Sequence, residues 1–436
     1  MLQDIFLVEI GIPDKFLLYA PKHMALMAIN GAGAKAFVSL KQGGLSQGAD
    51  QINDLLQESG LLDEPLPIDA EPTRSDLTLC PTFRCSLCCT YCFSNGGVRQ
   101  TDLTLEMAKK AIDLALSRYP NDQIESSRLT WHGGGESTMA FQVMKEASYY
   151  HRRRCCELEI TPILSIVSNG VWPPSVKRWI IAEMDRISIS CDGPADIQDL
   201  QRPLVNGAPS STYVFQTLRD LAEAGVDFGI RATITEHNVR RMPEMVDFFH
   251  GLCGVKSLQF ERLTVCGRCE ESQIQAGTAQ DYVAYFRIAF ERACELGINL
   301  GCSGVRIFRR TRRFCGAAGR TLCVTPEGLL TTCHRVDNRD DPLAGEFIYG
   351  EWSEGGYSWD EQRLQNLQSR LAVENLGWCQ DCFCKYTCAG GCAASRFSET
   401  GSIEGQQSDD RCFIIRELTR LRLVHLAGEK GLLGVI

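Results

Sequence analysis

The stretch Cys85-Ser-Leu-Cys-Cys-Thr-Tyr-Cys92 decides the fold expected of this chain, because it sets three thiols at the spacing Cys-x3-Cys-x2-Cys. Cys85, Cys89 and Cys92 can wrap one face of an iron–sulfur cubane. A 4Fe-4S cluster has four irons, so three protein ligands leave one iron open, whereas a structural zinc site is normally closed by four ligands. The spacing therefore favours an iron–sulfur cluster that can bind a second molecule.

The sequence around these thiols alternates between strand-like and helix-like segments, which is typical of parallel strands joined by crossover helices. Predicted strands lie at residues 76–80, 127–131, 160–167, 186–191, 227–234 and 256–263. Predicted helices lie at 103–119, 139–153, 174–183, 213–224, 239–252 and 279–296. Six such units predict an α/β fold, a partial (β/α)6 TIM-like barrel over residues 75–304, with its chemistry at the carboxyl ends of the strands.

The two ends of the chain differ from this alternating region. Residues 1–74 predict a small domain with strands at 5–10, 16–20 and 24–29, helices at 33–40 and 50–62, and a proline-containing linker at 63–74. Residues 305–436 carry eight regularly spaced cysteines besides Cys384, with few long apolar periods. We expect bound metal to supply much of the core of this third domain.

Composition limits where such a protein works. The chain has 436 residues and 22 cysteines, and it is too long and too rich in apolar residues to need disulfides, so the cysteines favour metal ligands in a reducing cytosol. The sequence contains no run of 18 apolar residues, the length that a membrane span needs, and its start is unlike a secretory signal. A net charge of −9 argues against general electrostatic binding of nucleic acid. We expect a cytoplasmic enzyme that engages neither nucleic acid nor membrane.

The thiol spacing, with Tyr91 before its last cysteine, resembles the signature of the radical S-adenosylmethionine (SAM) superfamily. Trp131-His-Gly-Gly-Gly-Glu-Ser137 follows the second predicted strand and resembles the family's Gly-Gly-Glu motif, in which glycines admit a ligand and a carboxylate complements a cation. The resemblance implies that the open iron chelates SAM, whose reductive cleavage yields methionine and a 5′-deoxyadenosyl radical that abstracts hydrogen. The SAM contacts that it implies are Gly134, Gly135, Glu136, Ser168, Asn169, Ser190, Asp192 and Arg219. A solvated helix arginine explains Arg219 equally well.

A second cysteine pattern, from Cys315 to Cys412, is similar to the SPASM extension of radical SAM enzymes that modify peptides. The resemblance implies two further 4Fe-4S clusters, three in all, and both of them fully ligated. Their implied ligand sets are Cys315, Cys323, Cys333 and Cys392 for one, and Cys379, Cys382, Cys388 and Cys412 for the other. Full ligation suits electron transfer or architecture, since no iron is left open. A pair of closed zinc sites is the alternative.

Other cysteines need no such role. Cys80 and Cys88 fall outside the first spacing and are best explained as small buried neighbours. Cys266-Gly-Arg-Cys269 is an isolated Cys-x2-Cys, and a surface loop explains it better than a metal site.

The SPASM resemblance implies a ribosomally made precursor peptide as substrate, with an electron donor such as flavodoxin or ferredoxin. Residues 1–62 are similar in size and order to winged-helix-like domains that bind a leader peptide by strand addition, and a structural cap is the alternative. His334 stands where sulfatase maturases carry an aspartate base, and it is our candidate base.

The expected reaction is a carbon–carbon or thioether crosslink. Alternatives are epimerisation, with a cysteine thiol as hydrogen donor, and formylglycine formation by a sulfatase maturase. A non-enzymatic iron–sulfur or zinc scaffold is the alternative of another class.

Overall fold

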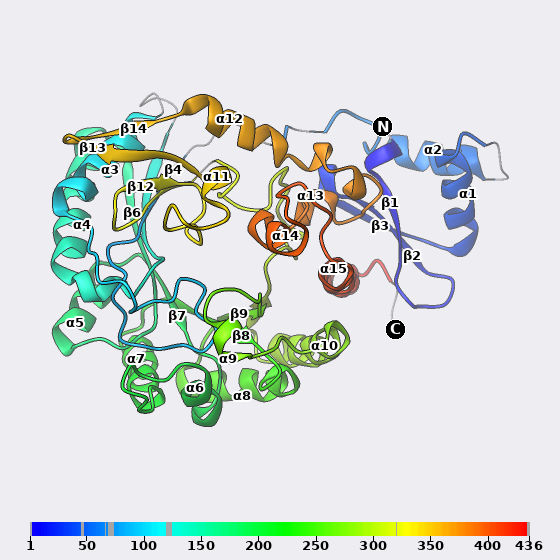
Figure 1. The fold of residues 1–436 in the computed structure, drawn as a ribbon. Helices are drawn as coiled ribbons and strands as arrows, with labels where there is room; N and C mark the ends of the chain where they lie inside the picture. Colours follow the sequence, from blue (N-terminus) through cyan, green and yellow to red (C-terminus); the bar gives the residue numbers. More distant parts are fainter. Residues whose placement is uncertain are drawn as a thin grey trace. The chain divides into compact units, whose positions relative to one another are not determined.

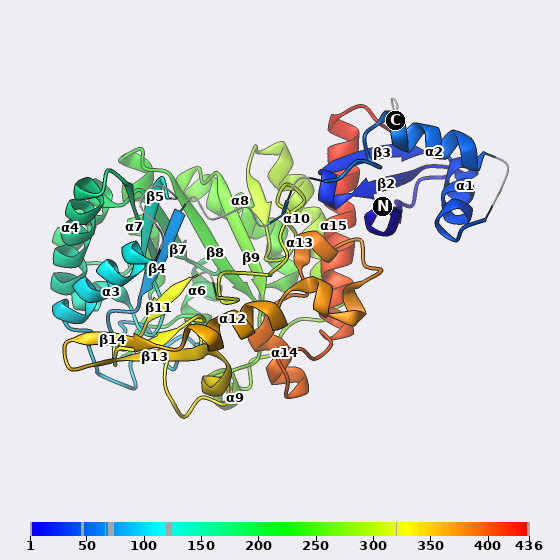
Figure 2. The ribbon, with the colours of Figure 1, turned by 90° about the horizontal axis from the view of Figure 1, so that it is seen from above.

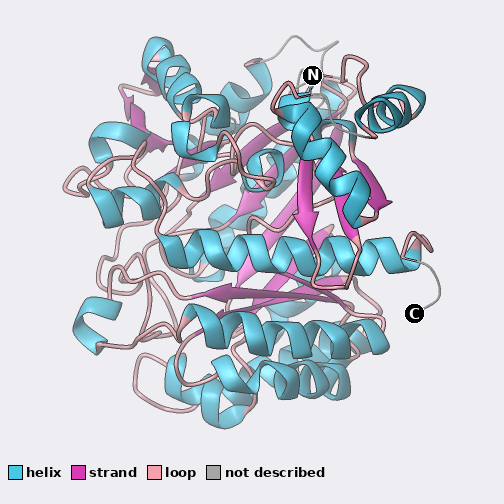
Figure 3. Cartoon of the chain, turned by 90° about the vertical axis from the view of Figure 1, so that its right-hand side faces the viewer, coloured by secondary structure: helices cyan, strands magenta, loops and turns pink. Residues whose placement is uncertain are grey.

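A computed structural model describes residues 2–433 apart from 45–47, 66, 69–73, 119–123 and 320. The chain separates into two compact units that interleave in sequence. One unit contains residues 71–302 and 315–369, and we call it the barrel unit. The other contains residues 1–70, 303–314 and 370–436, and we call it the terminal unit. Helices and strands alternate along much of the chain, and Figure 3 colours the two kinds of element.

The barrel unit is built on a curved sheet of parallel strands (Figure 1). These strands lie side by side in chain order, each parallel to the next. They are β4 (Arg74–Leu79), β5 (Ser126–Trp131), β6 (Thr161–Ser168), β7 (Arg186–Ser190), β8 (Phe228–Ile234), β9 (Ser257–Arg262) and the short β10 (Asn299–Gly301). Six strand-to-helix units therefore form the expected partial barrel.

Helices cover the outer side of this sheet (Figures 1 and 2). They are α3 (Leu105–Ser117), α4 (Phe141–Glu157), α5 (Pro174–Glu183), α6 (Ala195–Gln201), α7 (Ser211–Glu223), α8 (Met242–Cys253) and α10 (Ala279–Glu295), whereas the one-turn α9 (Cys269–Ser272) belongs to the loop after β9. Thr104 caps α3 by accepting from the amide of Met107, and Thr278 caps α10 in the same way from Asp281. Such caps satisfy amides that have no partner inside the helix.

Strand register separates an outer row of side chains from an inner row. The indole N–H of Trp131 donates to the hydroxyl of Ser148 in α4 at 3.1 Å, so the row of β5 that contains Trp131 faces the helices. Because paired residues of neighbouring strands share a face, this row continues through apolar partners. The pairs are Leu129 with Leu164, Ile166 with Ile187 and Ile189 with Ile230. The alternate residues of these strands face the inside of the barrel.

Four more strands extend the same sheet beyond β4. They are β11 (Leu322–Val324), β12 (Leu329–Thr331), β13 (Ile348–Ser353) and β14 (Gly356–Trp359), followed by α12 (Glu361–Arg370), with α11 (Ala344–Phe347) between β12 and β13. β11 pairs parallel to β4, and the later strands pair antiparallel. Residues 315–369 therefore belong to the barrel unit, although the sequence predicted a separate domain from residue 305 onward.

The terminal unit contains the small sheet expected at the start of the chain. It consists of β1 (Phe6–Glu9), β2 (Phe16–Ala20) and β3 (Ala25–Ile29), antiparallel and in that order. One face packs on α1 (Gly31–Lys41) and α2 (Ala49–Glu58) through Leu18 and Phe37. The other face packs on α15 (Asp409–Glu429) through Leu17 and Leu423 (Figure 2). α13 (Lys385–Cys388) and α14 (Ala393–Thr400) complete this unit.

The expected elements are found with small shifts at their ends. The end of the helix predicted at 103–119 and much of the linker predicted at 63–74 lie outside the described residues. The helix predicted at 239–252 begins as a 3-10 turn and continues as α8. Two short helices, α6 and α9, were not expected from the sequence. Across the residues that the structure describes, every helix is too short or too polar to span a bilayer.

Candidate functional site

Residues 80–99, which we call the thiol loop, leave the carboxyl end of β4 and carry Cys85, Cys89 and Cys92. Burial raises the pKa of Cys89 to about 12. The Arg202 cation lowers this pKa in part, and the nearby Cys92 and Cys85 thiols raise it further. Burial likewise raises the pKa of Cys85 to about 11. The three sulfurs therefore lie within electrostatic reach of one another, and a metal must displace protons from them to bind.

Donor groups of the protein point at these sulfurs. The Leu87 amide donates to Cys85 Sγ at 3.5 Å, and the Gly96 amide donates to Cys92 Sγ at 3.3 Å. The side-chain amide of Asn169 lies 3.9 Å from Cys85 Sγ. Hydrogen bonds to sulfur stabilise the charge of a ligated iron–sulfur cluster. Three thiols with amide donors around them fit a three-ligand cluster site.

A single metal ion needs its ligands closer together than a cluster does, because each thiolate of a cubane binds a different iron. Among the described residues, no three His, Cys, Asp or Glu side chains are grouped tightly enough for one ion.

The segment 266–272 holds the thiol loop from the side of β9. Arg268 donates from Nη1 to the Cys89 carbonyl at 2.9 Å and from Nη2 to the Gly96 carbonyl at 3.1 Å, and its amide donates to the Cys92 carbonyl at 3.0 Å. Ser272 Oγ donates to the Thr90 carbonyl at 2.7 Å. Cys266 to Arg268 form a partly exposed turn, as expected of a loop, but the segment also braces the cysteine-bearing backbone, and Cys269 is buried.

A buried polar network fixes Tyr91, which precedes the last cysteine of the loop. Its hydroxyl donates to Asp192 Oδ2 at 2.5 Å and accepts from Arg202 Nη1 at 2.7 Å. Asp192 also accepts from the Thr233 amide at 2.9 Å and from Gln201 Nε2 at 2.8 Å. Asp192 is fully buried, and both of its carboxylate oxygens accept hydrogen bonds from protein groups, so it anchors the end of β7.

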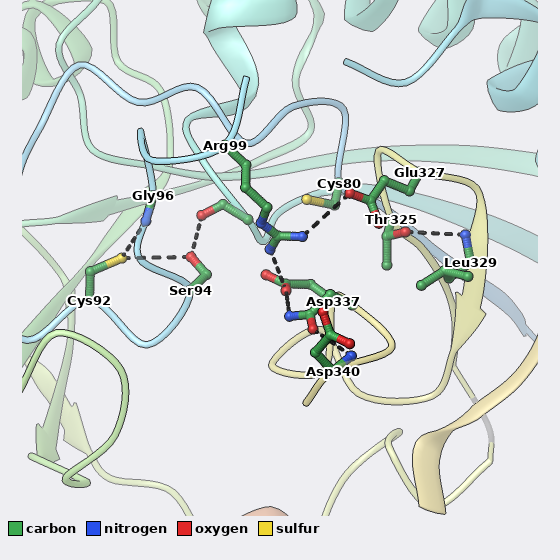
Figure 4. Close-up of polar contacts among 12 residues, drawn as sticks. Cys80, Cys92, Ser94, Gly96, Arg99, Thr325, Glu327, Leu329, Asp337 and Asp340 are labelled. Carbon is green, nitrogen blue, oxygen red and sulfur yellow. Dashed lines mark hydrogen bonds and ion pairs between the residues drawn. The ribbon is translucent and has the colours of Figure 1, made fainter. Parts of the chain in front are cut away.

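The thiol loop is also tied to the hairpin beyond β11 (Figure 4). Arg99 pairs with the buried carboxylate of Asp337 at 2.5 Å, and its second amino group lies 3.7 Å from Glu327. The guanidinium stacks on Phe83, 3.4 Å from the ring centre. Burial raises the pKa of Asp337, while Asn338 and Arg99 lower it in part. This ion pair joins the loop that carries three thiols to the loop that follows β12.

Glu136, the expected SAM contact after β5, is engaged by its own protein. Its carboxylate accepts from Ser168 Oγ at 2.7 Å, from the Asn169 amide at 2.8 Å and from Thr138 Oγ1 at 2.9 Å. The bonds lock the end of β5 to the end of β6. Gly134 and Gly135 pack directly on the thiol loop, where a side chain at Gly135 would overlap the Arg84 carbonyl. The motif therefore holds three strand ends together.

The remaining expected contacts lie in different places. Ser190 is the last residue of β7 and is on its inner row, paired in register with Arg231 of β8. Arg219 is exposed on α7, whose buried face is formed by Val214, Leu218 and Leu221. The structure thus favours the solvated helix arginine for Arg219.

His334 lies beside His132, with ring centres 4.6 Å apart, and 5.9 Å from the ring of Phe93. The His334 side chain has accessible surface, yet protein surrounds it closely enough that desolvation, together with the Arg231 cation, lowers its pKa to about 4. Burial, His334 and Arg231 lower the pKa of His132 well below its usual value. Both imidazoles are neutral at pH 7.

The expected cluster ligands of the barrel unit are partly gathered. Cys323 of β11 is buried, and the burial, with Cys80 and Cys333 nearby, raises its pKa well above the usual value. Cys80 therefore lies beside a proposed auxiliary ligand and not merely beside the first site. Cys315 is exposed, and Cys392 belongs to the terminal unit.

The second expected set lies wholly in the terminal unit. Burial raises the pKa of Cys379, and the nearby Cys388, Cys382 and Cys412 thiols raise it further, so the four sulfurs share one neighbourhood. Burial lowers the pKa of Arg396, and the nearby Cys392, Cys379 and Cys388 raise it in part, so Cys392 also lies close to this arginine. Four thiols gathered in this way fit a closed cluster.

Two arginines near the site were missed from the sequence. Arg231 could have been noticed as a charge at an inner position of an apolar strand, since period-two alternation sets its side chain opposite to Ile230. Arg268 carries no such signal, because its partners are backbone carbonyls about 180 residues away in sequence.

Parts of this chain are similar in sequence to other proteins. An uncharacterized protein of Methanocaldococcus jannaschii is 29% identical over 188 residues, which are 43% of this chain and 62% of that protein. A serine-type anaerobic sulfatase-maturating enzyme of Bacteroides thetaiotaomicron is 24% identical over 174 residues, which are 38% of this chain and 40% of that enzyme. The chain thus spans less than two thirds of each of these relatives.

Solved structures share the fold over most of the chain. That of anSMEcpe with bound AdoMet and Kp18Cys peptide has a TM-score of 0.64 at 18% identity, covering 82% of this chain and 100% of that one. That of Streptococcus suis SuiB bound to precursor peptide SuiA has a TM-score of 0.55 at 13% identity, covering 94% and 98%. Residues 79–249, from the end of β4 into α8, match the family model of the radical SAM superfamily. The thiol spacing lies inside this match, which confirms that residues 79–249 form the radical SAM domain that the spacing predicts.

Proposed function

We propose that this chain is a radical SAM enzyme that modifies a ribosomally made peptide and installs a carbon–carbon or thioether crosslink. The observation that carries the proposal is the thiol loop at the carboxyl ends of the barrel strands, with three neighbouring thiols and amide donors to their sulfurs. A 4Fe-4S cluster with bound SAM would supply there a 5′-deoxyadenosyl radical that abstracts hydrogen from carbon. The anSMEcpe and SuiB structures contain bound peptides, which supports a peptide substrate.

The protein's own groups would do the rest. Cys85, Cys89 and Cys92 would hold the cluster, with Arg268 fixing their backbone. The SAM pocket would be shaped by the residues expected from the sequence, namely Gly134, Gly135, Glu136, Ser168, Asn169, Ser190 and Asp192. Among them, Glu136, Ser168, Asn169 and Asp192 are held in place by hydrogen bonds within the protein, which would make that side of the pocket rigid. Phe93 of the thiol loop, whose ring centre lies 5.9 Å from that of His334, would keep water from the reacting carbon.

His334 would accept the proton that leaves the substrate when the new bond forms. Its neutral imidazole has a ring nitrogen with a free lone pair, as a base requires. His132 would hold the His334 ring in place through their contact at 4.6 Å. We expect His334→Ala to keep SAM cleavage and lose peptide product, and liquid chromatography with mass spectrometry measures both.

The cysteine-rich parts would carry the other two clusters, with Cys315, Cys323, Cys333 and Cys392 as one ligand set and Cys379, Cys382, Cys388 and Cys412 as the other. Closed clusters would take up the electron released with the proton. Flavodoxin or ferredoxin in the cytosol would supply the electron for SAM cleavage.

The sheet of the terminal unit would bind the leader of the precursor. Since β1 and β3 are its outer strands, each has an edge that no strand of this sheet pairs with. An extended peptide can add to such an edge through backbone hydrogen bonds.

An anaerobic assay tests the proposal. The reconstituted chain should bind about twelve irons, four for each cubane, and form 5′-deoxyadenosine with SAM and a strong reductant. The peptide encoded beside its gene should then lose two hydrogens on crosslinking, and none on epimerisation. Bound zinc without nucleoside would overturn the proposal.

A further inference from the structure

Arg231 is a cation on the inner side of the barrel, and no acidic side chain in the described part of the chain is paired with it. Its side chain is exposed, and it forms no hydrogen bond or ion pair with any described residue. The arginines around the thiol loop differ: Arg202 bonds the Tyr91 hydroxyl, and Arg268 bonds two carbonyls. An arginine remains charged in proteins and has five N–H donors to satisfy.

The strand register fixes the direction of this side chain. Ile189 of β7 pairs with Ile230 of β8 in the outer row, which continues through the sheet to Trp131 and its bond to α4. Arg231 is the next residue and therefore points inward, beside Ser190. Its place at the last pair of β7 is the end of the barrel where the thiol loop lies.

Two histidine rings lie within electrostatic reach of the guanidinium. His132 follows β5 in its inner row, and His334 reaches the same place from the loop after β12. Both rings interact electrostatically with Arg231. An imidazole has at least one N–H in either protonation state, so the group offers the charge of Arg231 and further donors to an anion.

We propose that Arg231, with His132 and His334, binds a carboxylate of the peptide substrate. The inference rests on the function proposed above and names its substrate class: a peptide with Asp, Glu or its own C-terminal carboxylate next to the reacting carbon. The carboxylate belongs to the peptide and not to SAM, because His334 comes from outside the barrel strands and is the proposed base, which acts on the substrate. A guanidinium fits a carboxylate in two parallel hydrogen bonds.

A pair of small probes tests this site in the reconstituted full chain with SAM. N-acetylglutamate α-amide and N-acetylglutamine α-amide differ only in the side-chain carboxylate, and saturation-transfer NMR measures their binding. We expect only the acid to bind, with at least tenfold weaker binding in Arg231→Gln. Arg231→Lys should bind it with intermediate affinity, and Arg178→Gln, an exposed arginine on α5, should match the parent chain.

Binding of labelled SAM by equilibrium dialysis separates the two sources of a carboxylate. SAM affinity should change less than twofold in Arg231→Gln. Equal binding of both probes, no binding of the acid, or loss of SAM affinity instead of probe affinity would each overturn the inference. Formation of 5′-deoxyadenosine by the parent chain tests the proposed function separately, so that the two failures remain distinguishable.

Discussion

The two cysteine-bearing regions of this protein differ in what holds their backbone. In the thiol loop, protein groups fix the chain on both sides: Arg268 bonds two of its carbonyls, Ser94 bonds the Gly134 carbonyl, and Arg99 pairs with Asp337. The residues around Cys379 to Cys412 instead form the short helices α13 and α14 and a small apolar cluster of Val373, Leu376 and Tyr386, and Arg396 donates to the Gly390 and Ile403 carbonyls of the same segment. The bonds of Arg268 reach segments far away in the chain, whereas those of Arg396 stay within its own segment, so we expect the second region to depend more on bound metal.

This difference follows from the task proposed for each region. An open iron needs its three ligands in one fixed geometry while other molecules come and go, so a rigid loop serves it. A closed cluster can itself act as the crosslink of a loosely packed segment, since metal binding supplies folding free energy. The predictions below test that contrast from the largest effect to the smallest.

Cys89→Ala should abolish 5′-deoxyadenosine formation and lower the iron content by about four per chain. Because protein contacts hold the thiol loop, the thermal midpoint of the barrel unit should fall by only a few degrees. Iron analysis, nucleoside assay and circular dichroism measure the three quantities. Cys88→Ala is the matched control, since the exposed Cys88 lies next in the chain and outside the ligand spacing. An active Cys89→Ala enzyme would contradict the ligand assignment.

Cys382→Ala should unfold much of the terminal unit, with a loss of about 4 kcal/mol or more, as loss of a structural metal site gives. Limited proteolysis between residues 370 and 412 should show it, while the barrel unit stays resistant. Cys384→Ala serves as control, because Cys384 is buried in the same segment but lies outside the implied ligand set. If both variants resist protease equally, the region from Cys379 to Cys412 is stable without metal, and it does not differ from the thiol loop in this respect.

Sequence patterns were sufficient for the longer helices and strands of the barrel. Period-two apolar runs such as Arg186–Ser190 and the periodicity of Pro174–Glu183 predicted a strand and a helix at the observed places. The pairing of β11 with β4 could not be predicted, because a three-residue strand has no period and its partner lies some 245 residues earlier. The spacing of Cys85, Cys89 and Cys92 led to the site, but spacing carries no information about the bonds of Arg268 or the neighbours of Arg231.

Acid should weaken the barrel unit through His151, which is buried between α4 and β5. Its Nε2 lies 3.0 Å from Ser127 Oγ, and burial, with Arg152 nearby, lowers its pKa to about 4. The unfolded chain binds a proton near pH 6.5, so stability is complete above that pH and is lost as pH falls toward 4. At pH 5 the loss should be about 2 kcal/mol.

Thermal unfolding of the parent chain and His151→Gln at pH 8 and pH 5 measures this loss. The variant should be less stable at pH 8 but should lose about 2 kcal/mol less on acidification. Identical pH dependence in the two chains would show that other groups govern acid unfolding. Proteolysis of the terminal unit at both pH values separates its response from that of the barrel unit.

Arg268→Gln tests the brace that makes the thiol loop rigid. A glutamine can replace one of the two carbonyl bonds but not both, and it lacks the charge that strengthens them. We therefore expect about tenfold faster loss of iron from the first cluster to a chelator, with the fold intact by circular dichroism. Arg262→Gln is the matched control, because Arg262 also donates to a carbonyl, that of Gly277, away from the thiol loop. Equal iron release in both variants would mean that the cluster, and not the polypeptide, fixes the loop, and the two cysteine regions would then follow the same rule.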